Sequence, residues 1–250
     1  MFWPLMTHHA FTALRFRNRT PLVVLALSAS LLLAASAFGA SQTGTTGDDA
    51  LRGTAHPEQL YGEAGNDRLE GLGGADYLEA GPGNDFAGGG DGNDLLIGGT
   101  GNDDLRGNSD DDVVYAGAGE DEVNGGNGDD TLFGQLGTDR IFGGPGRDSI
   151  YSGTGSDLID GGPGRDQLTA TGDGDTTIRG GAGDDHILAA AGSDTVDPGP
   201  GRDRVRSGGG NDTVNARDGS RDRIDCGRGD DMVVADEQDV LRNCENVARR

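Results

Sequence analysis

A nine-residue period is the feature that most constrains this chain. An acidic residue followed two positions later by an aliphatic residue returns every nine residues from Gly44 to Val234. The stretch divides into 21 units, nineteen of nine residues and two of ten, with the extra residues near Thr177 and Ser220. A fixed short period predicts a solenoid, in which each unit stacks on its neighbours and cannot bury its apolar side chains alone.

Each unit combines a glycine-rich half with a short apolar half. Position six is Asp in 20 units, with Glu58 as the exception, and position eight is Leu, Ile or Val in all units except that of Ala87. Positions one, two and four are mostly Gly, Ala or Ser, and the chain holds 48 Gly in 250 residues. Glycine permits the positive φ of a tight turn. We therefore expect a loop followed by a three-residue strand at positions seven to nine, whose central side chain points inward.

The consensus G-G-x-G-x-D-x-U-x, with U aliphatic, resembles the RTX or haemolysin-type calcium-binding nonapeptide repeat. The closest copies begin at Gly89, Gly98 and Gly125. This resemblance implies an all-β fold, a right-handed parallel β-roll (β-solenoid) over residues 44–234. Two units would form one coil of 18 residues, giving about ten coils at roughly 4.8 Å each. A small C-terminal cap is expected over residues 235–250.

The same resemblance implies that several Ca²⁺ ions lie between consecutive coils, held by position-six Asp and loop carbonyl oxygens. Carbonyl and carboxylate oxygens in a flexible loop suit Ca²⁺ better than Mg²⁺. The predicted metal ligands are Asp67, Asp76, Asp85, Asp94, Asp103, Asp112, Asp121, Asp130, Asp139, Asp148, Asp157, Asp166, Asp185, Asp194, Asp203, Asp212 and Asp231. Asn108-Ser109-Asp110 and Gln135-Leu136 depart from the loop consensus, so we expect fewer ions than units. Asp104, Asp111 and Asp129 are expected to be solvated surface charges.

The chain is strongly acidic. It carries 43 Asp and Glu against 20 basic residues, a net charge of −23, and only 33% of its residues are hydrophobic. Such a composition opposes compaction unless cations neutralise it, and it repels nucleic acid and anionic lipid. We therefore expect folding to depend on calcium, and we expect no nucleic-acid or membrane partner.

Residues 1–37 have the order of a secretory signal peptide. Arg15, Arg17 and Arg19 precede an apolar run from Leu22, which ends at the small-residue triplet 35–37. This order predicts cleavage and a secreted, extracellular protein. The alternative is an uncleaved membrane anchor, because the run is nearly long enough to span a bilayer. A further open alternative is that translation begins at Met6.

Two cysteines, Cys226 and Cys244, lie near the C-terminus. An even number in an exported chain favours a disulfide between them, with two free thiols as the alternative. Beyond Val234 the period fades. Two structures are open for this segment. One is a helix with an apolar face made of Val240, Leu241, Cys244 and Val247. The other is a last degenerate coil over residues 239–241.

No catalytic motif is found in the sequence, so we expect no enzyme. There is no H-E-x-x-H, no G-x-S-x-G and no nucleophile with a suitable His. The favoured function is a monomeric calcium-binding protein with a structural or cell-surface role. The alternative is an adhesin-like module that binds glycan or a cell surface through an outer face. Tyr115, Phe133 and Tyr151, spaced 18 residues apart at position nine, are predicted to stack on that face.

Overall fold

The computed structural model describes residues 39–249 as one body built only of β-strands and loops. Its 24 strands form two sheets of 12 strands each. Within these residues there is no helix, and so none that could cross a membrane. The signal peptide predicted over residues 1–37 lies outside the described residues.

The two sheets share the strands alternately. Sheet A contains β1 (Ser41–Thr43), β3 (Gln59–Tyr61), β5 (Tyr77–Pro82), β7 (Leu95–Thr100), β9 (Val113–Ala118), β11 (Thr131–Leu136), β13 (Ser149–Thr154), β15 (Gln167–Thr169), β17 (His186–Leu188), β19 (Arg204–Arg206), β21 (Arg223–Asp225) and β23 (Val240–Arg242). Sheet B contains β2 (Ala50–Arg52), β4 (Arg68–Gly73), β6 (Phe86–Asp91), β8 (Asp104–Ser109), β10 (Glu122–Asn127), β12 (Arg140–Phe142), β14 (Leu158–Pro163), β16 (Thr177–Ala182), β18 (Thr195–Asp197), β20 (Thr213–Ala216), β22 (Met232–Ala235) and β24 (Asn246–Arg249).

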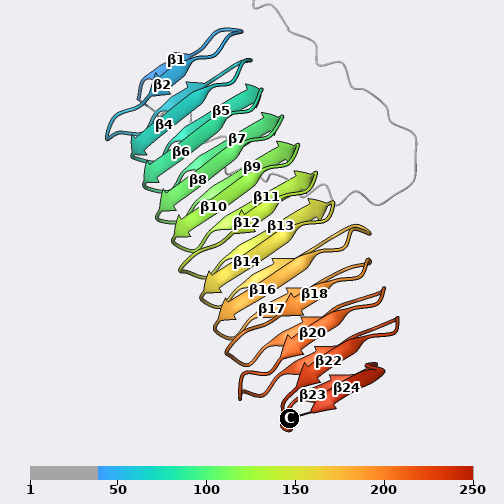
Figure 1. The fold of residues 1–250 in the computed structure, drawn as a ribbon. Helices are drawn as coiled ribbons and strands as arrows, with labels where there is room; N and C mark the ends of the chain where they lie inside the picture. Colours follow the sequence, from blue (N-terminus) through green and yellow to red (C-terminus); the bar gives the residue numbers. More distant parts are fainter. Residues whose placement is uncertain (1–38, 250) are drawn as a thin grey trace, which may run out of the picture. The chain divides into compact units, whose positions relative to one another are not determined.

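Every strand pairs in parallel with the strand two places along the chain, which makes a solenoid (Figure 1). Leu132, for example, lies opposite Val114 on one side and Ile150 on the other, an offset of 18 residues. The expected parallel β-solenoid with two units per coil is therefore confirmed. It has about twelve coils rather than ten, because β1 precedes the first unit and β23 and β24 follow the last.

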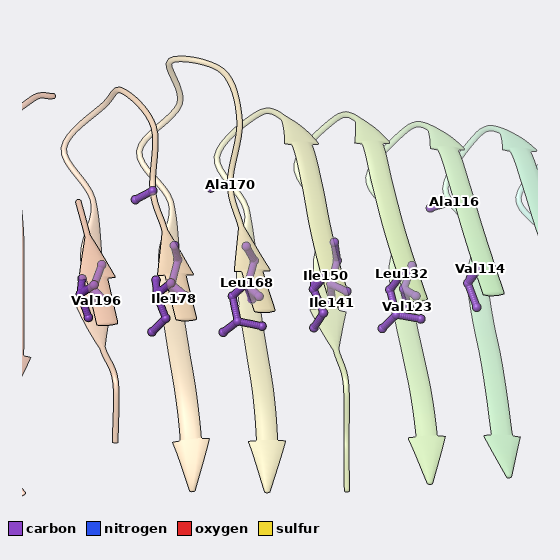
Figure 2. Close-up of a cluster of buried hydrophobic side chains, with 14 of the residues drawn as sticks. Val114, Ala116, Val123, Leu132, Ile141, Ile150, Leu168, Ala170, Ile178 and Val196 are labelled. Carbon is purple, nitrogen blue, oxygen red and sulfur yellow. The ribbon is translucent and has the colours of Figure 1, made fainter. Parts of the chain in front are cut away.

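The core is a single column of position-eight side chains between the two sheets (Figure 2). From Leu60 to Val233 these residues are at most 2% exposed, and only Leu51 at the N-terminal end is partly buried. Small residues at position one, such as Ala116, add to this interior. Each coil therefore buries its two aliphatic side chains only by stacking on its neighbours.

Many strands are longer than the three residues expected. In the six-residue strands, such as β4, β6 and β8, strand pairing continues into positions two and three of the next unit and omits position one. Gly99 and Gly101, at positions two and four, have φ of 124° and 116°, and a Cβ on either would collide with a carbonyl oxygen of the preceding coil. The glycine consensus therefore reflects both backbone conformation and the closeness of the coils.

Non-glycine residues at these positions adopt the same conformation. Leu72, Asn108 and Gln135 at position two have φ of 82°, 84° and 76°, and Asp110 at position four has φ of 73°. A side chain in the left-handed region costs roughly 1 to 3 kcal/mol and persists only where neighbouring structure enforces it. The departures from consensus therefore leave the coil intact, because the coils on either side impose the loop shape.

Three aromatic rings stack on the outer face of sheet A, as predicted. The ring centroids of Tyr115 and Phe133 are 4.7 Å apart, and those of Phe133 and Tyr151 are 5.1 Å apart, with interplanar angles of 3° and 9°. Their faces therefore cover one another, and such a stack strengthens the sheet.

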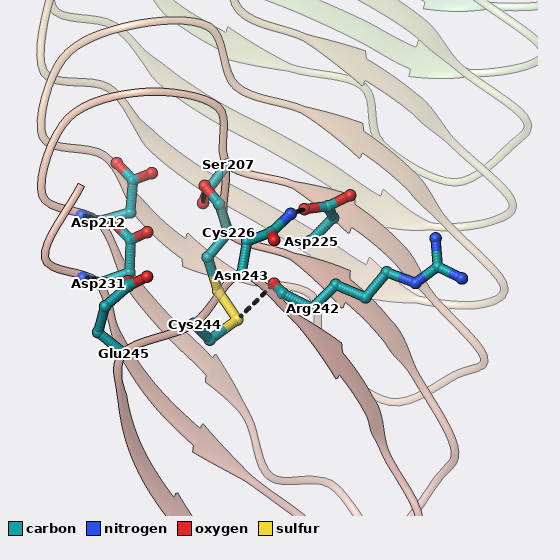
Figure 3. Close-up of a disulfide and its surroundings, with 9 residues drawn as sticks. All are labelled: Ser207, Asp212, Asp225, Cys226, Asp231, Arg242, Asn243, Cys244 and Glu245. Carbon is teal, nitrogen blue, oxygen red and sulfur yellow. Dashed lines mark hydrogen bonds between the residues drawn. A yellow bond between two sulfur atoms is a disulfide. The ribbon is translucent and has the colours of Figure 1, made fainter. Parts of the chain in front are cut away.

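The last coil is pinned by a disulfide between Cys226 and Cys244, which confirms the predicted pairing (Figure 3). Cys226 is fully buried next to the core. The helix considered for the C-terminal segment is wrong, since β23 and β24 continue the two sheets. Parallel pairing with β21 and β22 satisfies the backbone groups of this segment, and its apolar residues extend the solenoid pattern.

Reducing the disulfide, or replacing both cysteines by serine, is expected to cost about 3 kcal/mol, because the bond closes a short loop in the unfolded chain. The separation of the cysteines is 18 residues. The loss should appear as faster amide hydrogen exchange in β23 and β24 before the rest of the roll. Uniform destabilisation of all coils would contradict this local role.

Candidate metal centre

The position-six carboxylates form two continuous rows, one beside each sheet. Each row lies where the loops enter the strands, because position six directly precedes the strand residues at positions seven to nine. The row beside sheet A includes Asp94, Asp112 and Asp130, and the row beside sheet B includes Asp85, Asp103 and Asp121. All seventeen predicted ligands lie in these rows and are at most 4% exposed.

One oxygen of each carboxylate links neighbouring coils. Oδ1 of Asp112 accepts the backbone N–H of Asp94 at 2.8 Å, and the backbone N–H of Asp112 donates to Oδ1 of Asp130 at 2.8 Å. The same bond recurs along both rows at similar lengths, for example from Asp85 to Asp103. Each Asp therefore fixes the spacing of two coils through its first oxygen.

The second oxygen is buried without a hydrogen-bond partner. This holds for Oδ2 of all seventeen predicted ligands and of Asp222. A buried anionic oxygen with no partner is costly and calls for an explanation such as a bound ion. Oδ2 of Asp103 and the carbonyl oxygen of Ala116 both face the Cα of Gly98, where a Cβ would lie 2.6 and 2.5 Å from them. Carboxylate and carbonyl oxygens are thus brought together from successive coils.

The row beside sheet B lacks a carboxylate at one coil, where no ligand was predicted. In the ten-residue unit that begins at Ala170, the buried position is taken by Thr176 and not by Asp175, which is exposed. Thr176 keeps the link to the next coil through its backbone N–H, which donates to Oδ1 of Asp194. The inserted residue moves the acid out of the row, so the row beside sheet B is interrupted there.

Sequence reasoning left out residues that continue the rows. Asp222, from the second ten-residue unit, is fully buried and accepts the N–H of Asp203. Asp239 accepts the N–H of Asp222, and Oε2 of Glu245 accepts that of Asp231 at 3.3 Å. The ten-residue unit pointed to Asp222, whereas Asp239 and Glu245 lie beyond the last unit, where the period no longer marks them.

Position-five side chains form an outer ladder above each row. Oδ1 of Asp111 accepts the N–H of Asp129, and Oδ1 of Asp129 accepts the N–H of Arg147. Asp104 is not part of this ladder; it is the first residue of β8 and forms an ion pair with Arg106 at 2.8 Å on the outer face of sheet B. Asp111 and Asp129 are exposed, yet they also link coils, which goes beyond the solvated charges expected.

Burial raises the pKa of many of the row carboxyls, such as Asp94, Asp112 and Asp203. Desolvation is the largest cause at Asp94, Asp112 and Asp203, where the pKa rises from 3.8 to about 7, about 8 and about 8. Hydrogen bonds from backbone N–H groups oppose the rise, and neighbouring row carboxylates add to it. Without a cation, the charged form of these groups is thus disfavoured in the folded roll.

These shifts predict an inverse pH response for the calcium-stripped protein. The folded carboxyls keep protons that the unfolded chain has already lost above about pH 4, so protonation stabilises the roll at low pH and this stability is lost as pH rises through 7 to 8. Circular dichroism of calcium-stripped protein should show more β-structure at pH 5 than at pH 8. Calcium, which competes with protons for the carboxylates, should act at lower concentration at pH 8. Equal calcium midpoints at both pH values would contradict this.

No group of three or more Asp, Glu, His or Cys side chains forms a ready-made metal cage within residues 39–249. The acidic side chains are arranged as ladders, one carboxylate per unit on each side. A cation between the coils would therefore take part of its coordination from loop carbonyls, which Ca²⁺ accepts readily. The oxygen donors available between the coils, carboxylate Oδ2 atoms and loop carbonyls, therefore fit calcium.

Parallel coils, glycine loops and rows of buried carboxylates define a calcium-binding repeat solenoid. The family description "RTX calcium-binding nonapeptide repeat (4 copies)" matches overlapping segments of this chain from residue 52 to 168 and from 171 to 233. The chain belongs to this family. What matches is a repeat and not a catalytic domain, and comparison with curated proteins gives no match.

Proposed function

We propose that this protein is a secreted calcium-binding repeat protein that folds when Ca²⁺ binds between its coils. The observation that carries the proposal is the Oδ2 atom of the position-six Asp, which is buried without a hydrogen-bond partner in coil after coil of both rows. A bound cation would offset both the desolvation of these oxygens and their mutual repulsion. The position-six Asp and loop carbonyls of adjacent coils would supply the ligands.

Folding and binding are coupled in this proposal because the ligands come from different coils. Oxygens such as Oδ2 of Asp103 and the carbonyl of Ala116 meet only after stacking. Any ion that binds the stacked form and not the unfolded chain stabilises it, by about 2.7 kcal/mol per site at a hundred times the dissociation constant. With many such sites the folded fraction would respond steeply to calcium.

The role we propose is structural, outside the cell. Proteins with these repeats are typically secreted, and the leader-like residues 1–37 are consistent with export. Glycan stacking on Tyr115, Phe133 and Tyr151 is disfavoured, because the ring faces that would receive a sugar are turned toward one another.

The test is far-UV circular dichroism of the protein titrated with Ca²⁺ and, separately, with Mg²⁺. We expect a cooperative coil-to-β transition with Ca²⁺ and a weaker response to Mg²⁺, which demands a stricter octahedral geometry. A full β spectrum in excess chelator at neutral pH would refute calcium-dependent folding.

A further inference from the structure

The C-terminal half of sheet A carries a basic groove in an otherwise acidic protein. Two adjoining grooves share His186, Arg204 and Arg223, and together they are lined by seven arginines. The other five are Arg147, Arg165, Arg202, Arg206 and Arg242, and all seven are exposed. We call this surface the arginine groove.

Position and register concentrate these charges. Arg204 lies directly opposite Arg223 on the neighbouring strand, and His186 lies opposite Arg204 on the other side. Like charges facing each other across parallel strands destabilise a sheet. Folding alone therefore does not favour this arrangement, and an anionic partner would relieve it.

No groove arginine forms a side-chain ion pair with an acid among residues 39–249. Every ion pair in this part of the chain lies on sheet B or its edge, such as Arg52 with Glu70 at 3.4 Å and Arg179 with Asp160 at 3.9 Å. Four aspartates also line the groove, so seven arginines outnumber them by three. Asp166 and Asp185 are buried row carboxylates, and Asp225 lies in register between Arg206 and Arg242. Asp225 accepts a hydrogen bond from Asn243 (Figure 3), and Asp184 accepts the backbone N–H of Arg202.

The opposite face has the opposite character. The groove beside sheet B is lined by Asp104, Glu120 and Glu122 among its acids. Burial lowers the pKa of His186 in the arginine groove, and Arg206 and Arg204 lower it further. The two grooves thus differ in charge: arginines outnumber acids in the one on sheet A, and acids outnumber arginines in the one beside sheet B.

We propose that the arginine groove binds the sulfate- or phosphate-ester groups of a polysaccharide. Guanidinium groups donate in a planar fork that matches such oxyanions. In-register arginines on adjacent strands, roughly 4.8 Å apart, can both reach one tetrahedral anion.

The length of the groove favours a polymer. From β15 to β23 it crosses five strands of sheet A, about 20 Å at the usual strand spacing. A single small anion needs only two or three of these arginines. The lining contains no Phe, Tyr or Trp on which nucleic-acid bases could stack.

The test is binding of fluorescently labelled dextran sulfate to the protein in saturating Ca²⁺, with neutral dextran as the uncharged probe. We expect dextran sulfate alone to bind, and the double variant Arg204→Ser/Arg223→Ser to lose about tenfold or more in affinity, because charge-assisted hydrogen bonds are lost. The matched control, Arg52→Ser/Arg179→Ser, changes net charge equally on sheet B and should keep the affinity.

An equal loss in the control, or no loss in the groove variant, would overturn the proposal. So would tighter binding, dependent on the same arginines, to single-stranded DNA or to anionic vesicles. Circular dichroism of each variant in Ca²⁺ verifies that the roll is folded. The inference requires a folded roll but not calcium-dependent folding, so binding by a roll that proves folded in chelator would still support it.

Discussion

Replacing Asp112 with Asn is expected to cost about 3 kcal/mol of stability in saturating Ca²⁺, roughly the contribution of one filled site. The amide oxygen of Asn can still accept the N–H of Asp94, so the link between coils is kept. What is lost is the charge and the second anionic oxygen, Oδ2, which has no hydrogen-bond partner in the roll. The effect therefore isolates the metal-binding role from the structural one.

In excess chelator the sign of this effect is expected to change. Burial raises the pKa of Asp112 to about 8, so an unneutralised carboxylate at this position opposes folding. Asn removes that cost, and the variant should show at least as much β-structure as the parent without calcium. Circular dichroism of both proteins, with calcium and with chelator, measures the direction of the stability change under each condition.

Asp197→Asn is the matched control for this experiment. Asp197 lies exposed on the outer face of β18, and its replacement removes the same charge. It should leave the calcium midpoint nearly unchanged. If Asp112→Asn destabilises the protein equally with calcium and with chelator, the carboxylate is a structural group and the metal assignment fails.

Replacing Leu132 with Ala is expected to cost about 2 to 5 kcal/mol, the usual loss for a large side chain removed from a packed core. Leu132 is fully buried in β11 between Val114 and Ile150 of the neighbouring coils. The cavity would weaken both coil interfaces, because each coil is held by its two neighbours. Chemical denaturation in saturating calcium measures the loss.

Leu136→Ala, in the same strand, is the matched control. Leu136 is 58% exposed at the end of β11, so its truncation should change the free energy of unfolding by less than about 0.5 kcal/mol. Similar losses for the two variants would mean that the column of position-eight residues is not the core that holds the coils together.

The period determined most of the architecture in advance. A repeat of nine with one inward aliphatic residue, together with its resemblance to the RTX repeat, predicts a coil of two units with two parallel sheets. The 18-residue register of Leu132 with Ile150 and the burial of the whole position-eight column follow from it. The two rows of position-six Asp follow as well, since a fixed phase places them on the same edge of every coil.

The loops and chain ends could not be predicted in the same way. The phase of a ten-residue unit depends on which residue is extruded, and only packing against the adjacent coils placed Thr176 in the row and Asp175 outside it. The same packing held Leu72 and Gln135 in a conformation that their sequence disfavours. At the C-terminus, edge pairing with β21 and β22 prevailed over a helical pattern of apolar residues.

The sequence by itself thus determined the repeat, its register and the buried side chains, because each is a consequence of a local pattern repeated in phase. The count of two cysteines favoured their pairing. The tertiary structure alone decided which carboxylate oxygen links the coils and which is left without a partner. It also decided that Arg204 and Arg223, 19 residues apart, face the same way on sheet A without acids opposite them. Such charge balance depends on what lies across the strands, and a one-dimensional pattern does not contain that information.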